Sequence, residues 1–220
     1  MNYQERIEAL FERTPSYQNV GKDAYKPGVE SMLAFDNAAG HPHRNFPTVH
    51  IAGTNGKGSV SSMLAPALSY SGRKVGLYTS PHLTDFRERA RIVTENGFEL
   101  ISREEVISFL DRFDDFISEA ASSFFEITTA MAFDFFASHQ VDVAVIETGL
   151  GGRLDSTNII TPRISVITNI GLEHCAMLGN TLSEIAFEKA GIIKPGVPVV
   201  IGEIHPETRP VFAKKAAEYH

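Results

Sequence analysis

Several short runs of apolar and β-branched residues constrain the fold more than any other feature of this sequence. They read as largely continuous rather than alternating, which is typical of strands buried on both faces of a sheet. Helical periods lie between several of them, at 60–68, 106–113 and 127–135. Strands that alternate with helices predict an α/β fold, with a mostly parallel sheet flanked by helices. The predicted strands are 48–53, 74–80, 141–149, 164–170 and 197–202.

Length and composition narrow the class of protein. The 220 residues are 43% hydrophobic, enough for one sizeable domain with a core. A net charge of -7 without clustered Lys and Arg argues against nucleic-acid binding and leaves small molecules as partners. Cys175 is the single cysteine, and residues 1–17 hold neither a signal core nor a membrane-spanning run. We therefore expect a cytoplasmic protein that binds no membrane.

The stretch HIAGTNGKGSV, residues 50–60, is a variant phosphate-binding loop. The common loop has four residues between its first glycine and the Gly-Lys pair, followed by a Ser or Thr that binds magnesium. Here two residues separate Gly53 from Gly56, and Gly58 takes the place of the hydroxyl. The flanking strand and amphipathic helix favour a nucleotide site over a glycine-rich turn with a solvated Lys57. The loop nevertheless lacks one expected metal ligand.

Three polar residues lie at the carboxyl ends of predicted strands: Ser80 ends the second, Glu147 ends the third, and His174 follows the fourth. Open α/β sheets bind ligands beyond the carboxyl ends of their strands, so these side chains are candidates for one site. Together they could complete a magnesium shell with triphosphate oxygens, although imidazole is the least expected ligand for this cation. Each also has an ordinary interpretation, as a turn residue, a strand-end charge and a loop residue.

The segment 181–191 predicts a helix with clear ends. Thr181 is its N-cap, Glu184 completes a capping box, and Gly191 marks its end. Lys189 shares the apolar stripe of this helix, so its side chain should point toward the core. A buried lysine is costly unless it has a partner or a use, whereas a lysine that snorkels at the helix end is inexpensive. Both interpretations stay open.

Two stretches interrupt the alternation of strands and helices and are expected to be loops or flaps over a site. Residues 14–47 are rich in Pro, Gly and His, and within 81–102 a hairpin is predicted to turn at Asn96-Gly97. Pro66 falls inside a predicted helix, where it should cost about 3 kcal/mol or produce a kink.

Taken together, the motifs resemble the folylpolyglutamate synthase and dihydrofolate synthase family of ATP-dependent amide ligases, part of the Mur ligase superfamily. The resemblance runs from about residue 48 to about 202, through GTNGKGS, TSPHLTDFRER, FFEITTAMAF, ETGLGGRLDSTN and GLEHCAMLGNTLSEIAFEKAGI. It implies an N-terminal substrate-side segment, 1–47, and a P-loop Mur-ligase-like ATPase domain, 48–220. It also implies that the family's glutamate-binding C-terminal domain is absent, so that the chain is a fragment that ligates nothing alone. Its last helical stretch is expected to start at Pro206 and to leave an apolar sheet edge uncovered.

The resemblance assigns roles to individual residues. ATP would bind Thr54, Asn55, Gly56, Lys57, Gly58 and Ser59. Magnesium, expected as two ions, would bind with Ser80, Glu147 and His174 as its ligands, so that Ser80 supplies the hydroxyl that Gly58 replaces. Lys57, His174 and Lys189 would be catalytic, with Lys189 converted by carbon dioxide to a carbamate. The pterin-bearing substrate would lie along Phe124, Phe125, Glu126, Leu154, Asp155 and Ser156.

The implied reaction is the attachment of L-glutamate to a folate or a dihydropteroate through an acyl phosphate, by an enzyme that is a monomer at full length. Two details depart from the family pattern: Glu173 precedes the histidine where Asp is more common, and 28–35 lacks an arginine. A Mur-type ligase for a cell-wall precursor would use the same ATP half. A nucleotide-binding module without ligase chemistry would need neither the metal ligands nor a buried Lys189.

Overall fold

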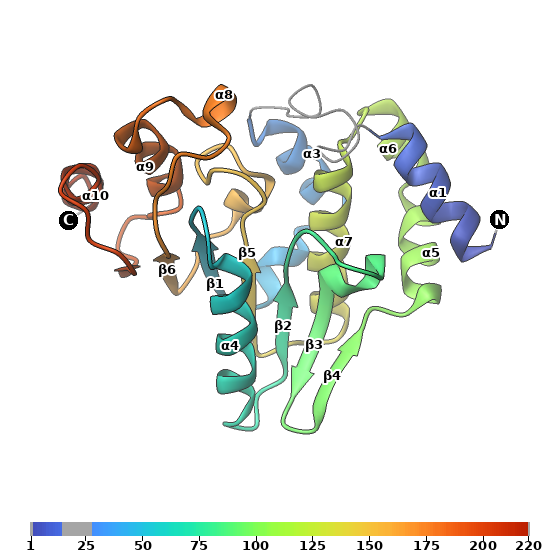
Figure 1. Ribbon diagram of the computed structural model, residues 1–220. Helices are drawn as coiled ribbons and strands as arrows, with labels where there is room; N and C mark the ends of the chain where they lie inside the picture. The colour runs from blue at the N-terminus through green and yellow to red at the C-terminus, as the bar shows by residue number, and fades with distance from the viewer. Residues whose placement is uncertain (1, 15–27, 220) are drawn as a thin grey trace.

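A computed structural model describes residues 2–14 and 28–219 and contains a seven-stranded sheet in the order β4-β3-β2-β5-β1-β6-β7 (Figure 1). Strands β2, β5, β1, β6 and β7 are parallel, while β3 and β4 are antiparallel to their neighbours. The prediction of a mostly parallel sheet is therefore confirmed. The strands are β1 (Thr48–Ala52), β2 (Val75–Tyr78), β3 (Ala90–Thr94), β4 (Gly97–Leu100), β5 (Val143–Glu147), β6 (Ile164–Ile167) and β7 (Val199–Ile201).

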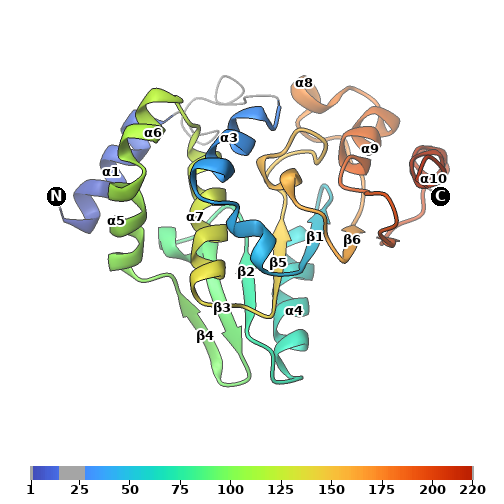
Figure 2. The same cartoon turned by 180° about the vertical axis from the view of Figure 1, so that it is seen from behind.

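Helices cover both faces of this sheet, with α4 in front in Figure 1 and α3 and α7 on the other side in Figure 2. On β5, Val145 packs in the cluster under α4, whereas Ala144 and Ile146 pack in the cluster under α7. Successive side chains point to opposite faces and both faces are buried, which explains the continuous apolar runs. The helices are α1 (Tyr3–Arg13), α3 (Glu30–Ala38), α4 (Lys57–Ser69), α5 (Arg103–Arg112), α6 (Asp114–Glu119), α7 (Phe124–Ser138), α8 (Cys175–Leu178), α9 (Leu182–Ala190) and α10 (Arg209–Ala217). Short 3-10 turns are η2 (Pro42–Asn45), η3 (Phe86–Arg89) and η4 (Ser156–Ile159).

Local signals place α9 as predicted. The Thr181 hydroxyl accepts the Glu184 N–H, and the Glu184 carboxylate accepts the Thr181 N–H, which makes a full capping box. Gly191 ends the helix for a different reason from the one expected. Its φ of -61° is right-handed, so no left-handed cap forms; instead, an added Cβ would lie 2.3 Å from Cα of Arg153. Glycine is required there because another backbone segment crosses the helix end.

The two stretches expected to be loops or flaps, 14–47 and 81–102, have different outcomes in the structure. The hairpin is confirmed, but its turn lies at Glu95-Asn96, one residue earlier than predicted, because Thr94 of β3 pairs with Gly97 of β4. The loop expected over 14–47 is wrong for 30–38, which form α3, while 15–27 lie outside the described residues. Met32 and Phe35 of α3 are fully buried in the same core as α7, and packing rather than local sequence holds this helix.

Pro66 lies inside a helix as predicted, whereas the helix expected to start at Pro206 starts later. Helix α4 continues through Pro66, and the Ser69 hydroxyl donates to the Pro66 carbonyl within its last turn. Helix α10 begins at Arg209 with Pro210 in its first turn, so the expected start at Pro206 is wrong. At the edge strand β7, Val200 is 48% exposed. In the part of the chain that the structure describes, no helix is long and apolar enough to cross a membrane.

Candidate functional site

The turn between β1 and α4, at the upper rim of the sheet in Figure 1, is built for close approach. Gly53 has a φ of 152°, and an added Cβ would lie 1.8 Å from Oγ1 of Thr168. The loop is tied to the segment after β6, since the Asn55 N–H donates to Oδ1 of Asn169 at 2.9 Å. Gly56, with φ 83°, precedes α4 and gives it no side-chain cap. A helix start without a side-chain cap is the arrangement in which backbone N–H groups can bind an anion, and that role of the loop stays a prediction.

Two lysines meet at one carbonyl oxygen of this loop. Lys57 Nζ donates to Gly53 O at 3.0 Å, and Lys189 Nζ donates to the same oxygen at 2.8 Å. Lys189 is 4% exposed, which confirms that it points into the core and rules out snorkelling. Burial, together with the nearby charge of Lys57, lowers the pKa of Lys189 to about 8. A larger fraction of this amine is neutral at physiological pH than for an exposed lysine.

Glu147 ends β5 beside the phosphate loop. Its side chain is 3% exposed, and a Cβ added to Gly58 would lie 3.5 Å from its Oε2. Burial raises the pKa of Glu147 to about 7, against the opposing effects of the Lys57 charge and of a hydrogen bond from the Ser80 backbone. Oε2 itself finds no hydrogen-bond partner among the described residues. A buried carboxylate oxygen with an unmet charge, beside a phosphate loop, fits a magnesium ion.

His174 is placed less clearly than the other two predicted metal ligands. It has a left-handed φ of 51° ahead of α8, and its Nε2 lies 3.6 Å from Oε1 of Glu173. Among residues 2–14 and 28–219, no group of three His, Cys, Asp or Glu side chains is placed to hold a metal ion. The structure thus joins Ser80 to Glu147 by a hydrogen bond, while His174 as the third ligand stays a prediction.

Phe124, Phe125 and Glu126 begin α7, and all three have structural partners. Phe124 is 4% exposed and stacks on Phe11 with 4.7 Å between ring centroids. The Glu126 carboxylate accepts the Ser123 N–H at 2.7 Å in a capping box and also accepts the Ser31 hydroxyl. Phe125 lies tilted against Tyr78, with 6.0 Å between ring centroids, and is partly exposed. The substrate role of these three residues stays a prediction.

Asp155, flanked by the partly exposed Leu154 and Ser156, organises the loop that follows β5. Its Oδ2 accepts the N–H groups of Gly149 and Leu150 at 2.9 and 2.8 Å. This structural role of Asp155 was not predicted, although an Asp two residues before a Thr at a turn, here Thr157, is a recognisable signal.

His50, whose ring contacts the Thr157 hydroxyl, was also missed, because it lies inside an apolar run that offers no local signal.

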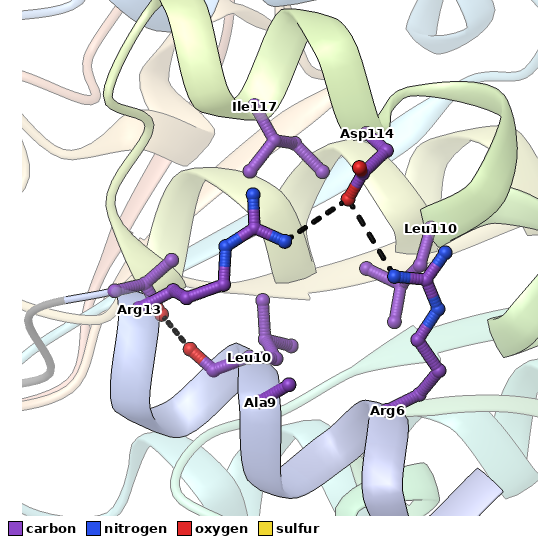
Figure 3. Close-up of a pocket in the computed structure, with 8 residues that line it drawn as sticks. Arg6, Ala9, Leu10, Arg13, Leu110, Asp114 and Ile117 are labelled. Carbon is purple, nitrogen blue, oxygen red and sulfur yellow. Dashed lines mark hydrogen bonds and ion pairs between the residues drawn. The ribbon is translucent and has the colours of Figure 1, made fainter. Parts of the chain in front are cut away.

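A separate shallow pocket lies between α1 and the pair α5 and α6 (Figure 3). Arg13 donates to Oδ1 of Asp114 at 3.1 Å, and Nη1 of Arg6 lies 3.6 Å from the same oxygen. Ala9, Leu10 and Ile117 contribute apolar walls. The charged groups thus satisfy one another and attach α1 to the domain, away from the phosphate loop.

Comparison with known proteins agrees with this geometry. The Mur ligase middle domain matches residues 51–201, which include the phosphate loop, Glu147 and α9. The chain belongs to the Mur ligase family. Its relatives place it with the folylpolyglutamate and dihydrofolate synthases: it is 41% identical over 205 residues to a dihydrofolate synthase/folylpolyglutamate synthase of Bacillus subtilis (strain 168), covering 90% of this chain and 47% of that protein.

Solved structures agree in fold over the whole chain. The apo form of the L. casei folylpolyglutamate synthase superposes with a TM-score of 0.88 at 38% identity, covering 100% of this chain and 52% of that one. A folylpolyglutamate synthase solved as a complex with AMPPCP and folate gives a TM-score of 0.85 at 37% identity, covering 100% and 52%. The chain therefore spans about half the length of these relatives.

Proposed function

We propose that this chain is the ATP-binding half of a ligase that attaches L-glutamate to a folate or a dihydropteroate. The observation that carries the proposal is the buried Glu147 Oε2 beside the phosphate loop, which has no hydrogen-bond partner among the described residues. The similar enzyme solved with AMPPCP and folate supports a nucleotide and a folate as the ligands. The full-length enzyme is proposed to act in the cytoplasm as a monomer, with residues 1–47 on the substrate side and 48–220 as the ATPase domain.

The reaction joins two anions in its first step. A substrate carboxylate oxygen attacks the γ-phosphorus of ATP and ADP leaves, which gives an acyl phosphate. The amine of glutamate then attacks the acyl carbon, phosphate leaves, and the nitrogen loses a proton to form the amide. Positive charge near the transferring group is what such chemistry needs most.

Each part of the phosphate loop has a distinct task in this proposal. The first N–H groups of α4, with Thr54, Asn55, Gly56, Gly58 and Ser59 around them, bind the phosphates. Lys57 leaves the Gly53 and Thr54 carbonyls, which it contacts at 3.0 and 3.2 Å, and moves toward a phosphate oxygen. Ser80, Glu147 and His174 hold magnesium, which when bound neutralises phosphate charge.

Lys189 is proposed to carry a carbamate. Carbon dioxide reacts with a neutral amine, and burial keeps a larger share of Lys189 neutral than is usual. The product would be an anion close to Lys57, whose ammonium contacts the same Gly53 oxygen. A gain in intact mass of one carbamate in bicarbonate buffer, absent from Lys189→Met, would support this step. Identical spectra for the two proteins would contradict it.

Calorimetry with AMPPCP tests the nucleotide site in this chain. We expect magnesium to tighten AMPPCP binding, and we expect Glu147→Gln to remove most of that increase because it replaces a charged ligand with a neutral one of the same shape. Ser80→Ala should have a smaller effect in the same direction. Binding that is independent of magnesium in the unmodified chain would refute the metal assignment.

Incorporation of labelled glutamate tests the ligase itself. ATP-dependent incorporation into a folate or dihydropteroate acceptor is expected from a chain of the relatives' full length and not from residues 1–220 alone. Turnover by residues 1–220 at a comparable rate would show that the remaining half is dispensable. A chain that prefers a UDP-sugar to a reduced folate would instead be a ligase for a cell-wall precursor.

A further inference from the structure

A buried chain of polar side chains connects β1 with the loop after β5. His50 is fully buried in β1, and its Nε2 lies 2.8 Å from Oγ1 of Thr157, which is also fully buried. The Thr157 hydroxyl bonds in turn to Oδ1 of Asp155. The other carboxylate oxygen of Asp155 accepts the N–H groups of Gly149 and Leu150. Three hydrogen bonds in series, the last of them made to two N–H groups, therefore connect the strand that leads into the phosphate loop with the glycine-rich segment.

The direction of these bonds follows from the donors available. Both Asp155 oxygens already face backbone N–H groups, since Oδ1 also accepts the Thr157 N–H at 3.0 Å. The single hydroxyl hydrogen of Thr157 is therefore donated to the carboxylate, and its oxygen must accept from His50. The His50 proton accordingly sits on Nε2, which agrees with an Nδ1 atom that has no partner among the described residues. Burial lowers the pKa of His50 to about 3, so the ring is neutral and carries one proton.

The glycine-rich segment, residues 149–153, fits closely against the last turn of α9. The Arg153 N–H donates to the carbonyl of Glu188 at 2.7 Å. A Cβ added to Gly152 would lie 3.0 Å from the carbonyl oxygen of Lys189. Because both neighbours are backbone atoms, a displacement of residues 149–153 must displace the turn that carries Lys189.

We propose that His50 is a positioning residue, which acts through Thr157 and Asp155 to set residues 149–153 against α9 and thereby sets Lys189 against Gly53. His50 lies three positions before Gly53 in the chain. The same strand therefore positions the Gly53 carbonyl, which accepts from Lys189, and the His50 side chain, which supports the segment behind Lys189. The use of this alignment in nucleotide binding rests on the proposed function. The position of the His50 proton and the structural order of residues 149–153 do not depend on the proposed function.

The first test is the tautomer of His50 in the unmodified chain. Long-range proton–nitrogen correlation spectra of protein with ¹⁵N-labelled histidine distinguish a protonated Nε2 from a protonated Nδ1. The His50 signals are assigned among the eight histidines by their loss in His50→Gln. We expect the Nε2–H form at every pH from about 5 to about 8, because the folded pKa is near 3. An Nδ1–H tautomer, or protonation of the ring in that range, would overturn the proposal.

The second test separates positioning from simple packing. Thr157→Val keeps the shape but removes the hydroxyl, while Thr157→Ser keeps the hydroxyl and serves as the matched control. We expect amide exchange at Gly149, Leu150 and Arg153 to accelerate by at least about tenfold in Thr157→Val, which loses the hydroxyl's bonds to both Asp155 and His50, and to stay near the original rate in Thr157→Ser. Equal exchange in the two variants would overturn the relay.

The third test concerns the nucleotide. Affinity for AMPPCP with magnesium should fall about tenfold in His50→Leu and recover in His50→Gln, whose amide nitrogen can replace Nε2 as a donor to Thr157. Equal affinities in His50→Leu and His50→Gln would refute a positioning effect on the site. If the unmodified chain binds no AMPPCP at all, the proposed function fails, while the tautomer and exchange measurements still decide whether the relay exists.

Discussion

Replacing Lys189 with methionine should change how stability depends on pH. Methionine is also unbranched and flexible, so it fills the same buried space without a charge. In the native chain the Lys189 ammonium is 4% exposed, and its pKa is lowered from 10.5 to about 8 by burial and by Lys57. The difference between those two values corresponds to about 3 kcal/mol, at about 1.4 kcal/mol for each pKa unit.

The sign of this pH dependence follows from whether the folded or the unfolded state binds the Lys189 proton more tightly. Below pH 8 both states carry the proton, and the folded state bears the whole cost of the buried charge. Between pH 8 and 10.5 the folded amine is neutral while the unfolded amine is still protonated, so the free energy of unfolding rises with pH. From pH 7 to pH 9.5 this rise amounts to about 2 kcal/mol, and Lys189→Met should lack it. At pH 7 the variant should also be more stable by about 2 kcal/mol, once the lost hydrogen bond to Gly53 is subtracted.

Urea unfolding at pH 7 and pH 9.5, in buffers free of carbon dioxide, measures the effect. Other groups titrate equally in both proteins, so the difference between the two pH-dependent changes isolates Lys189. Lys214→Met, at an exposed position of α10, is the matched control and should keep the pH dependence of the unmodified chain. The same pH dependence in Lys189→Met as in the unmodified chain would show that burial does not depress this pKa.

Three further changes test the packing and the caps. Gly191→Ala places a Cβ 2.3 Å from the Arg153 backbone and should cost about 1–3 kcal/mol in urea unfolding; full native stability would mean that α9 can move away freely. Gly76→Ala brings a Cβ to 2.9 Å from the Phe136 ring and should cost a similar amount. Phe136→Leu should recover part of that loss, and strict additivity of the two changes would argue against a clash. Thr181→Ala should lower stability by about 1 kcal/mol while Thr181→Ser stays near native, unless the capping box contributes nothing.

The elements that could be predicted are those whose signals are local. Apolar runs identified the parallel strands, and the Thr181 and Glu184 pair identified the start of α9. Helix α3 could not be predicted in this way, because it has no side-chain N-cap and only nine residues. Its stability comes from Met32 and Phe35, which are buried against elements distant in the sequence.

The candidate site likewise has features that local sequence could predict and features that depend on distant contacts. The positions of Ser80 and Glu147 at strand ends were sufficient to predict that they meet. The stripe on α9 predicted that Lys189 is buried, but not that its partner would be Gly53 O, 136 positions away. The pairing of His50 with Thr157 spans 107 positions and joins two residues that local patterns would assign to a strand interior and a turn. Such contacts depend on strand order, which local periodicity does not determine.

The order of the strands also fixes when, during synthesis of the chain, the loop between β1 and α4 can form. Strand β1 pairs only with β5 and β6 among the described strands, so it has no neighbour until residues 143–147 have been made. By contrast, β2, β3 and β4 can pair with one another soon after they emerge from the ribosome. Domains in general fold during synthesis as their parts become available. A nascent chain stopped before residue 143 should therefore protect the β3–β4 hairpin from protease and leave residues 48–60 open to cleavage, whereas one extended past 167 should protect both.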